Sequence, residues 1–572
     1  MYKKNKRALQ PLLLSDVNDL PERSREYLKS SWAETFRREV FLRIPEDRFK
    51  VLYDPDPSRP NVPVNVMVGL NVLKEWRGWT DEEMYEHFLF DMQVRYALGC
   101  DNFSEGDFDL RTMYNFRKRM SKHALESGEN LIKVVFEHIT DEQIKKLNVN
   151  TKIQRMDSTQ ILSNIADLSR LELLVGILQR LYRILNKADQ ASYAGVFQPY
   201  IRESAGLYSY RIRGKEAVWE HIQQVGVVLH GLLNELAPGY QGEAVYQVAQ
   251  RFFDENFKLV ENQVQAKSNA EIQPGCLQSL DDLEAGFRRK GNHSYKGFVG
   301  NVTETCDPDN PLQLITNVQV QSNRISDIEL LKQALPELKE RMELGTLVTD
   351  GAYTGPSVDQ ALRAYDVEQI TTGLIGALPT HPNGMLSMSD FEMHLDAEGN
   401  LEKMACPAGQ EATIHLQPSG KAYLITFRES QCQACPMHQE GKCPARKYKR
   451  QAHFGFNLPK SCILSSLRIH RFRACKKEAR ALRPAAEATI FQVKHKLKHG
   501  KVRVRGLLRT SYVFVCSAIA VNLRRIHRFE NEQQRGKQSS KKRSRASSSA
   551  FLCSSPLFIC SSGGFLATWR RV

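Results

Sequence analysis

Three acidic residues far apart in the chain stand in local sequences that could build a metal site: Asp157 in MDSTQI, Asp350 in LVTDGAYTG and Glu487 in RPAAEATIF. Apolar and β-branched residues lead into Asp350 and glycine follows at once, which predicts a buried strand that ends on a carboxylate. The alternative is a plain Asp-Gly turn, because both residues suit turn geometry. Asp157 is flanked by the apolar Met156 and Ile161, so we expect it inside a second strand, with a strand-end turn as the alternative.

Glu487 is predicted to lie on a helix between two cations. Arg483 precedes it by four positions and Lys494 follows it by seven. At 3.6 residues per turn, the three side chains would share one helix face. The alternative is a solvated ion pair between Arg483 and Glu487, the usual state of such pairs. Glu478 is the nearest competing acid, but it lacks cations at these spacings.

Carboxylates from two strands and a helix suit hard divalent cations, which prefer oxygen ligands. Two such ions, about 3.5–4 Å apart, can clamp the attacking and leaving oxygens of an in-line phosphoryl displacement. The predicted cofactor is therefore Mg²⁺ or Mn²⁺, as two ions on Asp157, Asp350 and Glu487. One ion would activate water or a DNA 3′-hydroxyl, and the other would stabilise the leaving oxygen.

Four of the 12 cysteines are clustered: Cys406, Cys432, Cys435 and Cys443. The Cys432–Cys435 pair has the Cys-x-x-Cys spacing of a zinc knuckle, and the outer two could complete a tetrahedral site, with His438 as a substitute ligand. Reduced structural cysteines are the alternative. Any zinc held here would be structural.

Basic residues point to a polyanionic partner. The chain has 80 Lys plus Arg against 65 Asp plus Glu, a formal net charge of +15. Between Arg483 and Arg509 the only acid is Glu487, and this stretch is predicted to contact DNA phosphates. A second basic group lies on a predicted helix. The candidate DNA-binding residues are Arg117, Lys118, Arg119, Arg483, Lys494, Lys496, Lys498, Arg503 and Arg505.

The elements that must position these side chains follow from periodicity. Helices are predicted over 64–79, 80–99, 109–139, 168–187, 326–342, 470–500 and 510–526, with a capping box at Thr80 and Glu83 and a cap at Ser326. Strands are predicted around Asp157, over 294–306 and 312–321, and before Asp350. This order of strands and helices indicates a mixed α/β domain behind an all-α N-terminal domain.

The same pattern divides the chain. We expect an N-terminal arm (1–60), a helical DNA-binding domain (61–130), a catalytic domain (150–529) and a disordered basic, serine-rich tail (530–572). The catalytic domain would carry a helical insert at about 165–265 and a cysteine-rich insert at about 378–450. No run approaches the ~18 apolar residues of a membrane helix. We expect a cytoplasmic, nucleoid-associated protein with no membrane partner.

Taken together, these motifs resemble the DDE transposases of bacterial insertion sequences. The resemblance runs from about residue 40 to 529 and rests on the N-terminal helices, MDSTQI, TDGAYTG and RPAAEATIFQVKHKL. It implies an RNase H-like catalytic core with large insertions and assigns the three carboxylates as its catalytic, metal-binding residues. The family's glutamate motif often begins with tyrosine, and Arg480 stands at that position here.

The resemblance implies a DNA transposase that cuts phosphodiester bonds at the ends of its element and joins them to target DNA. Its partners would be the terminal repeats, target DNA and further copies of the chain, in a dimer or a larger synaptic assembly. Two alternatives stay open: an RNase H-like metal nuclease without strand transfer, and a non-catalytic DNA-binding relic of a transposase.

Overall fold

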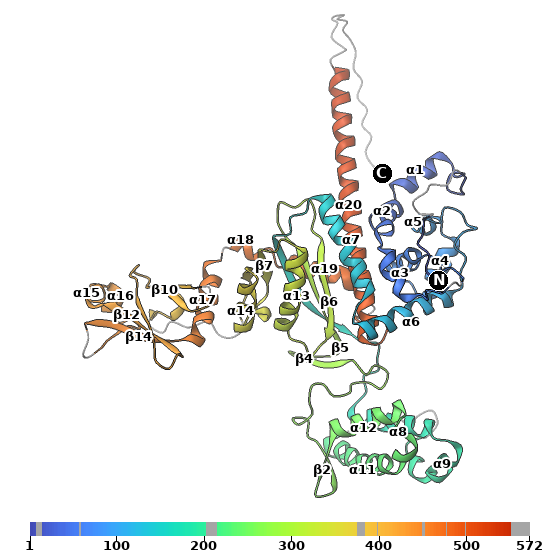
Figure 1. Cartoon of the computed structure of the whole chain (residues 1–572), viewed down its shortest axis with the longest axis horizontal. Coiled ribbons are helices and arrows are strands. Elements are labelled where there is room, and N and C mark those ends of the chain that lie inside the picture. Colours follow the sequence, from blue (N-terminus) through green and yellow to red (C-terminus); the bar gives the residue numbers. More distant parts are fainter. Residues whose placement is uncertain are drawn as a thin grey trace, which may run out of the picture.

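The computed structural model describes residues 1–6, 14–56, 59–201, 214–374, 384–396, 398–448, 452–475, 477–497 and 499–550. The architecture is mixed α/β, as predicted. A central sheet lies between an N-terminal helical region and two inserts, one helical and one rich in short strands (Figure 1). Within the described ranges, no helix is both long and apolar enough to cross a membrane.

The N-terminal region is built from short helices. The residues predicted to begin and end these helices mostly do so: Gly78 ends α3 in the left-handed conformation, and Thr80 and Glu83 form the capping box of α4. Two predicted helices are each split, at Asp91, which caps α5, and at Gly128, which ends α6. The bounds are α1 Glu22–Ser30, α2 Trp32–Glu39, α3 Val64–Arg77, α4 Asp81–Phe90, α5 Met92–Ala97, α6 Leu110–Ser127 and α7 Leu131–Leu147.

The expected N-terminal arm differs from what the structure contains. Helices α1 and α2 lie within it, and their apolar residues share one core with α3. Phe36 and Phe41 are fully buried there. Ser31 supplies the local signal, because its side chain accepts a hydrogen bond from the N–H of Ala33 and caps α2. Much of this segment is therefore part of the helical domain.

The central sheet has the strand order β4-β5-β1-β7-β8, with β6 also paired to β5. Strand β1 runs antiparallel to β5 and parallel to β7, which is itself parallel to β8. The strands predicted from the sequence are all present. Their bounds are β1 Ile153–Leu162, β4 Gly286–Lys290, β5 His293–Thr305, β6 Ile315–Ser322, β7 Thr346–Thr349 and β8 Glu368–Thr371.

Helices cover both faces of this sheet. Helices α13 (Asp327–Arg341, capped by Ser326) and α14 (Pro356–Ala364) pack with Met156 and Leu347 on one face. On the other face, Ile161 and Phe298 join a core that includes α20 (Leu507–Ala550) and the N-terminal helices. Side chains alternate between the faces of a strand, so Asp157 lies on the same face as Ile161.

The two inserts have cores of their own. The helical insert consists of α8 Arg170–Ile184, α9 Lys187–Ser192, α10 Ala194–Phe197, α11 Lys215–Tyr240, α12 Ala244–Asn256, β2 Phe257–Val260 and β3 Gln263–Ala266. The cysteine-rich insert consists of β9 Glu392–Leu395, β10 Leu401–Ala405, β11 Thr413–Leu416, β12 Ala422–Arg428, α15 Glu429–Gln433, α16 Pro436–Gln439, β13 Arg446–Lys447 and β14 His453–Pro459. It extends past the predicted boundary at 450.

The end of the chain also differs from its prediction. Helix α20 begins in the predicted apolar segment but continues to Ala550, so residues 530–550 of the expected disordered tail are helical. Lysine, arginine, glutamine and alanine favour helix, and no proline occurs between the start of α20 at Leu507 and Pro556. The helix extends away from the rest of the molecule (Figure 1). Residues 551–572 lie outside the described part of the chain.

Gly300 provides a test of the packing between sheet and helix. A Cβ atom there would lie 2.7 Å from Phe514 of α20 and 2.9 Å from Ile161. We expect Gly300→Ala to lower the free energy of unfolding by about 1–3 kcal/mol, because the added methyl overfills a packed core. The matched control is Gly231→Ala in α11, where no atom lies within 4 Å of the added Cβ. Urea denaturation of both variants should show loss of stability only for Gly300→Ala.

Candidate active site

The pairing of β1 with β7 brings two of the predicted carboxylates together. The parallel register pairs Ile153 with Thr346 and Arg155 with Val348. The ladder ends there, so Asp157 and Asp350 each follow its last pair by two residues, at the same end of the ladder. The strand end that carries Asp350 therefore lies next to the strand interior that carries Asp157.

Asp350 also makes the turn that was its alternative interpretation. Its Oδ1 accepts a hydrogen bond of 2.9 Å from the N–H of Ala352 and caps a single 3₁₀ turn. Gly351 is needed for the close approach of the following segment, because a Cβ there would lie 2.9 Å from the carbonyl carbon of Gly373. The turn thus uses Oδ1 of Asp350 to fix the backbone. The other carboxylate oxygen, Oδ2, is not part of this turn.

One guanidinium joins all three predicted carboxylates. Arg483 Nη2 lies 2.9 Å from Asp157 Oδ2 and 3.6 Å from Asp350 Oδ2, and its Nη1 lies 2.7 Å from Glu487 Oε1. The side chains of Arg483 and Asp157 are mostly buried, whereas that of Glu487 is 70% exposed. The structure therefore gathers acids from β1, from the end of β7 and from a helix around one positive charge.

Burial dominates the electrostatics of Asp157. It raises the pKa of this carboxyl to about 6, and the neighbouring charges of Asp350 and Glu487 act in the same direction. Arg483 opposes this shift because its positive charge favours the carboxylate. The site thus combines like charges that repel one another with a cation that holds them in place.

The helix that carries Glu487 is shorter than predicted. The described residues of the stretch 470–500 include the end of α17 (Lys460–Ala474), α18 (Lys477–Arg480) and α19 (Ala485–Lys494). Arg483 comes before α19 because Pro484 stands at its start, so the prediction of one face carrying all three residues was wrong for Arg483. The side chain still reaches Glu487. Arg480, at the family's tyrosine position, stacks on Phe472 at 4.1 Å.

Lys494 faces the sheet at the end of α19. Its ammonium donates hydrogen bonds of 3.0 Å to Thr159 Oγ1 and 2.7 Å to the carbonyl of Gln160, both on β1. Burial lowers the pKa of Lys494. In this arrangement Lys494 fixes α19 to β1, two residues along the strand from Asp157.

The three carboxylates suit a divalent cation by their chemistry, because their oxygens already surround one positive charge, the guanidinium of Arg483. As the side chains stand, the described part of the chain contains no group of three or more His, Cys, Asp or Glu spaced to hold a metal ion. Arg483 lies among the three acids. Metal binding at Asp157, Asp350 and Glu487 would therefore require this guanidinium to move.

The basic segment after α19 lies beside both the site and the N-terminal domain. Lys496 contacts Gly78, since its Cδ lies 3.1 Å from where a Cβ would be. Arg503 is exposed, and Arg505 is exposed but donates to the carbonyl of Asn164. Lys498 lies outside the described residues. The segment thus leads from the carboxylates to α3, with most of its described cations at the surface.

The three cations predicted on α6 have separate environments. Arg117 donates to Asn71 and Asp81 at 2.8 and 2.7 Å, so it is largely engaged within the domain. Arg119 lies over the ring of Tyr53 at 4.6 Å. Lys118 is exposed. The structure therefore presents Lys118 to a partner more directly than Arg117 or Arg119.

Three of the clustered cysteines, Cys406, Cys432 and Cys443, pack against the core of the cysteine-rich insert, and the N–H of Cys435 donates to the carbonyl of Cys432. Burial raises the pKa of Cys432 to about 11, and the charges of Cys443, Cys406 and Cys435 act in the same direction. All four are free thiols, and among the described residues no three of them are spaced to hold a metal ion. The ring of His438 packs edge-on against Phe454. Zinc binding here stays a prediction.

We expect the purified full chain to carry close to stoichiometric zinc, measured by atomic absorption, because four thiols of one insert, two of them with the Cys-x-x-Cys spacing, match the ligand set of a structural site. The double variant Cys432→Ser, Cys435→Ser should lose the metal and the stability of the insert. Cys276→Ser, in a segment remote from the cluster, is the control and should retain zinc. Zinc-free wild type with four titratable thiols would instead support reduced structural cysteines.

Several polar residues around the site were not predicted from the sequence. Ser158 donates to Asp327 at 2.6 Å, on the face of β1 opposite to Asp157. Glu304, in the middle of TET within β5, is buried and bonded to Arg155. A charged residue inside an otherwise apolar strand was the available signal, but its partner depends on the register between β5 and β1.

Comparison with known families adds two matches. Residues 405–527 match a family model described as a transposase DDE domain, and residues 26–119 match one described as a transposase domain (DUF772). The first contains the four cysteines, Arg483 and Glu487; Asp157 and Asp350 lie outside both. No curated protein and no solved structure matches the chain.

Proposed function

Because these two family matches support an insertion-sequence DDE transposase, we propose that the chain cleaves phosphodiester bonds at the ends of its element and transfers the new 3′ ends to target DNA. The observation that carries the proposal is the convergence of Asp157, Asp350 and Glu487 on Arg483. Acids from two adjacent parallel strands and a helix, set on one mixed sheet, also support an RNase H-like core.

In this proposal Asp157, Asp350 and Glu487 hold two Mg²⁺ or Mn²⁺ ions. When bound, these ions supply the Lewis acidity that neutralises charge on the attacking and leaving oxygens. Metal binding uses the carboxylate form of Asp157, and because the pKa of this group is raised to about 6, that form is lost as the pH falls below about 6. Arg483 leaves the carboxylates and becomes free to contact a phosphate, for which its planar fork is well suited.

The DNA partner follows from the distribution of charge. We propose that Lys496, Lys498, Arg503 and Arg505 contact the phosphate backbone between the catalytic carboxylates and the N-terminal domain, and that Lys118 extends this path. The substrate would be the terminal repeats and target DNA, at a cytoplasmic, nucleoid-associated location. Joining two ends calls for a dimer or a larger assembly of this chain.

The test is an assay of the purified full chain with DNA that carries the ends of the element found beside its gene. We expect Mg²⁺- or Mn²⁺-dependent cleavage at the ends, followed by covalent joining to a second duplex. Cleavage without joining would replace the proposal by a metal nuclease. End binding without cleavage in either metal would replace it by a non-catalytic DNA-binding protein.

A further inference from the structure

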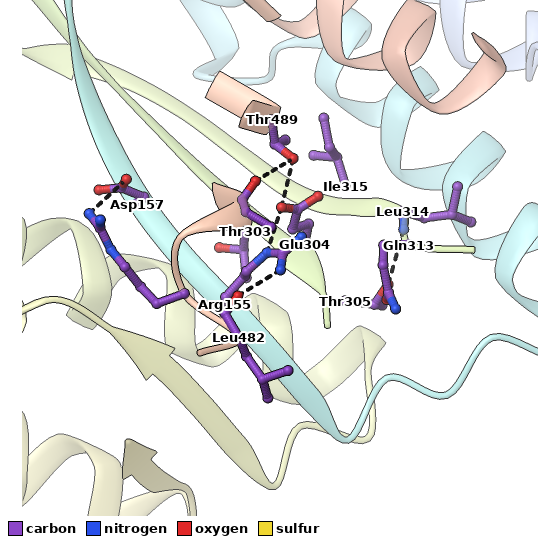
Figure 2. Close-up of polar contacts among 12 residues, drawn as sticks. Arg155, Asp157, Thr303, Glu304, Thr305, Gln313, Leu314, Ile315, Leu482 and Thr489 are labelled. Atoms are coloured by element: carbon purple, nitrogen blue, oxygen red, sulfur yellow. Dashed lines mark hydrogen bonds and ion pairs between the residues drawn. The ribbon is translucent and has the colours of Figure 1, made fainter. Parts of the chain in front are cut away.

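We propose that a buried polar network centred on Glu304 positions Arg483 and Glu487 against Asp157, so that its members are positioning residues for the metal site. This inference rests on the proposed function. The network consists of Arg155, Glu304, Thr489 and Arg525, together with the carbonyl of Leu482. Figure 2 shows Arg155, Glu304, Thr489 and Leu482 together with Asp157.

The network begins on the strand that carries Asp157. Arg155 precedes Asp157 by two positions, so both side chains lie on one face of β1. The register between β1 and β5 sets Arg155 directly opposite Glu304, and Arg155 Nε donates to Glu304 Oε1 at 2.7 Å. Cross-strand neighbours of this kind interact directly. Glu304 is therefore fixed relative to Asp157 by strand pairing.

From the strands, the network reaches both segments that carry the other site residues. Arg155 Nη1 donates to the carbonyl of Leu482 at 2.7 Å, immediately before Arg483 (Figure 2). Thr489 Oγ1 donates to Glu304 Oε1 at 2.7 Å, and Thr489 follows Glu487 by two positions on α19. Glu304 is thus linked through Arg155 to the backbone before Arg483. It is linked through Thr489 to the helix that carries Glu487.

Helix α20 closes the network from the far side. Arg525 Nη1 donates to Glu304 Oε2 at 2.7 Å, and its Nη2 donates to Thr489 Oγ1 at 2.5 Å. Both oxygens of Glu304 and the hydroxyl of Thr489 are therefore bonded. A fully satisfied polar network in a buried setting specifies one arrangement of its elements.

A contribution to the stability of the fold does not by itself explain why these buried positions carry charged residues. The side chain of Glu304 is 2% exposed and that of Arg155 9% exposed. Burying such charges carries a large desolvation cost, and apolar residues of similar volume often stabilise a fold as well or better. Glu487 itself is exposed, so its placement depends on how α19 is anchored. The geometry points to placement of α19 as the role of Glu304 and Thr489.

The test compares Thr489→Val, which removes the hydroxyl at nearly constant shape, with Thr489→Ser, which keeps it. Mn²⁺ binding to the full chain is measured by electron paramagnetic resonance of the free ion, next to the melting temperature. We expect Thr489→Val to weaken Mn²⁺ binding by about 10-fold or more, the scale of outer ligand partners. Thr489→Ser should restore most of it, and Thr489→Val should have little further effect when Glu487→Gln is already present.

The control is Asp101→Asn, which removes the charge of a part-buried ion pair of 2.7 Å with Arg37 in the N-terminal domain. It should lower the melting temperature while Mn²⁺ binding stays as in wild type. The inference is overturned if Thr489→Val behaves like this control, or if its effect on Mn²⁺ is undiminished in the Glu487→Gln background. In both of these outcomes the wild type still binds Mn²⁺ and cuts DNA, so only the inference about the network fails. If the wild type neither binds Mn²⁺ nor cuts DNA, the proposed function fails as well.

Discussion

Asp350→Asn should abolish metal-dependent cleavage of the element ends while the protein still binds them. The substitution keeps the size of the side chain and the cap on the N–H of Ala352, but it removes the negative charge that would ligate the metal. We expect a loss of at least about 10²–10³-fold in cleavage rate, the scale on which single electrostatic groups act in transition states. Cleavage would be followed on end-labelled DNA in Mg²⁺ and in Mn²⁺, and binding by gel shift.

The matched control is Asp141→Asn. The side chain of Asp141 is 33% exposed, against 32% for Asp350, and it also pairs with an arginine, Arg341. Its position on α7 is outside the carboxylate group, so cleavage by this variant should match wild type. Equal cleavage rates for Asp350→Asn and wild type would leave LVTDGAYTG as a turn without a catalytic role.

Arg483→Gln should increase the response of the protein to metal. In wild type the guanidinium holds Asp157, Asp350 and Glu487 together. Its loss leaves Asp157 largely buried without a partner cation, which costs about 3 kcal/mol in comparable cases. We expect a lower melting temperature without metal and a larger increase on adding Mn²⁺ than in wild type, because the ion no longer competes with Arg483.

Arg341→Gln controls for the loss of a mostly buried arginine. Arg341 pairs with Asp141 and Glu337, and its side chain is 12% exposed, against 16% for Arg483. This variant should melt earlier, yet its increase with Mn²⁺ should equal that of wild type. If Arg483→Gln gives the same Mn²⁺ increment as wild type, the guanidinium does not occupy the position that the metal takes.

The local elements around the site could be predicted from the sequence because each has a short-range signal. Scattered apolar residues and the β-branched Thr159 mark β1, Ser326 marks the start of α13, and the Asp-Gly step marks the end of β7. These signals act within a few residues, so they do not depend on the rest of the fold. They also locate Asp157 within a strand, Asp350 directly after another strand and Glu487 on a helix.

Contacts between these elements could not be predicted in the same way. Pro484 shortens α19 and leaves Arg483 outside the helix, yet the side chain still reaches Glu487. Whether Glu304 faces Arg155 depends on the register of two antiparallel strands, and a slip of one residue would turn it to the other face. The extent of α20 shows the same limit, because its basic, serine-rich end resembles a disordered segment in composition.

Helix α20 also sets the order in which the molecule can be completed during synthesis. His527 bonds to Thr35, 492 positions earlier in the chain, and α20 residues complete the core of the N-terminal helices. At about 5–20 residues per second, a ribosome needs roughly 25–100 s to make the intervening chain. During that time the apolar faces of α2 and α3 are not yet covered by α20. An N-terminal fragment, or a message cut short, would thus produce chains with exposed apolar surface and a tendency to aggregate.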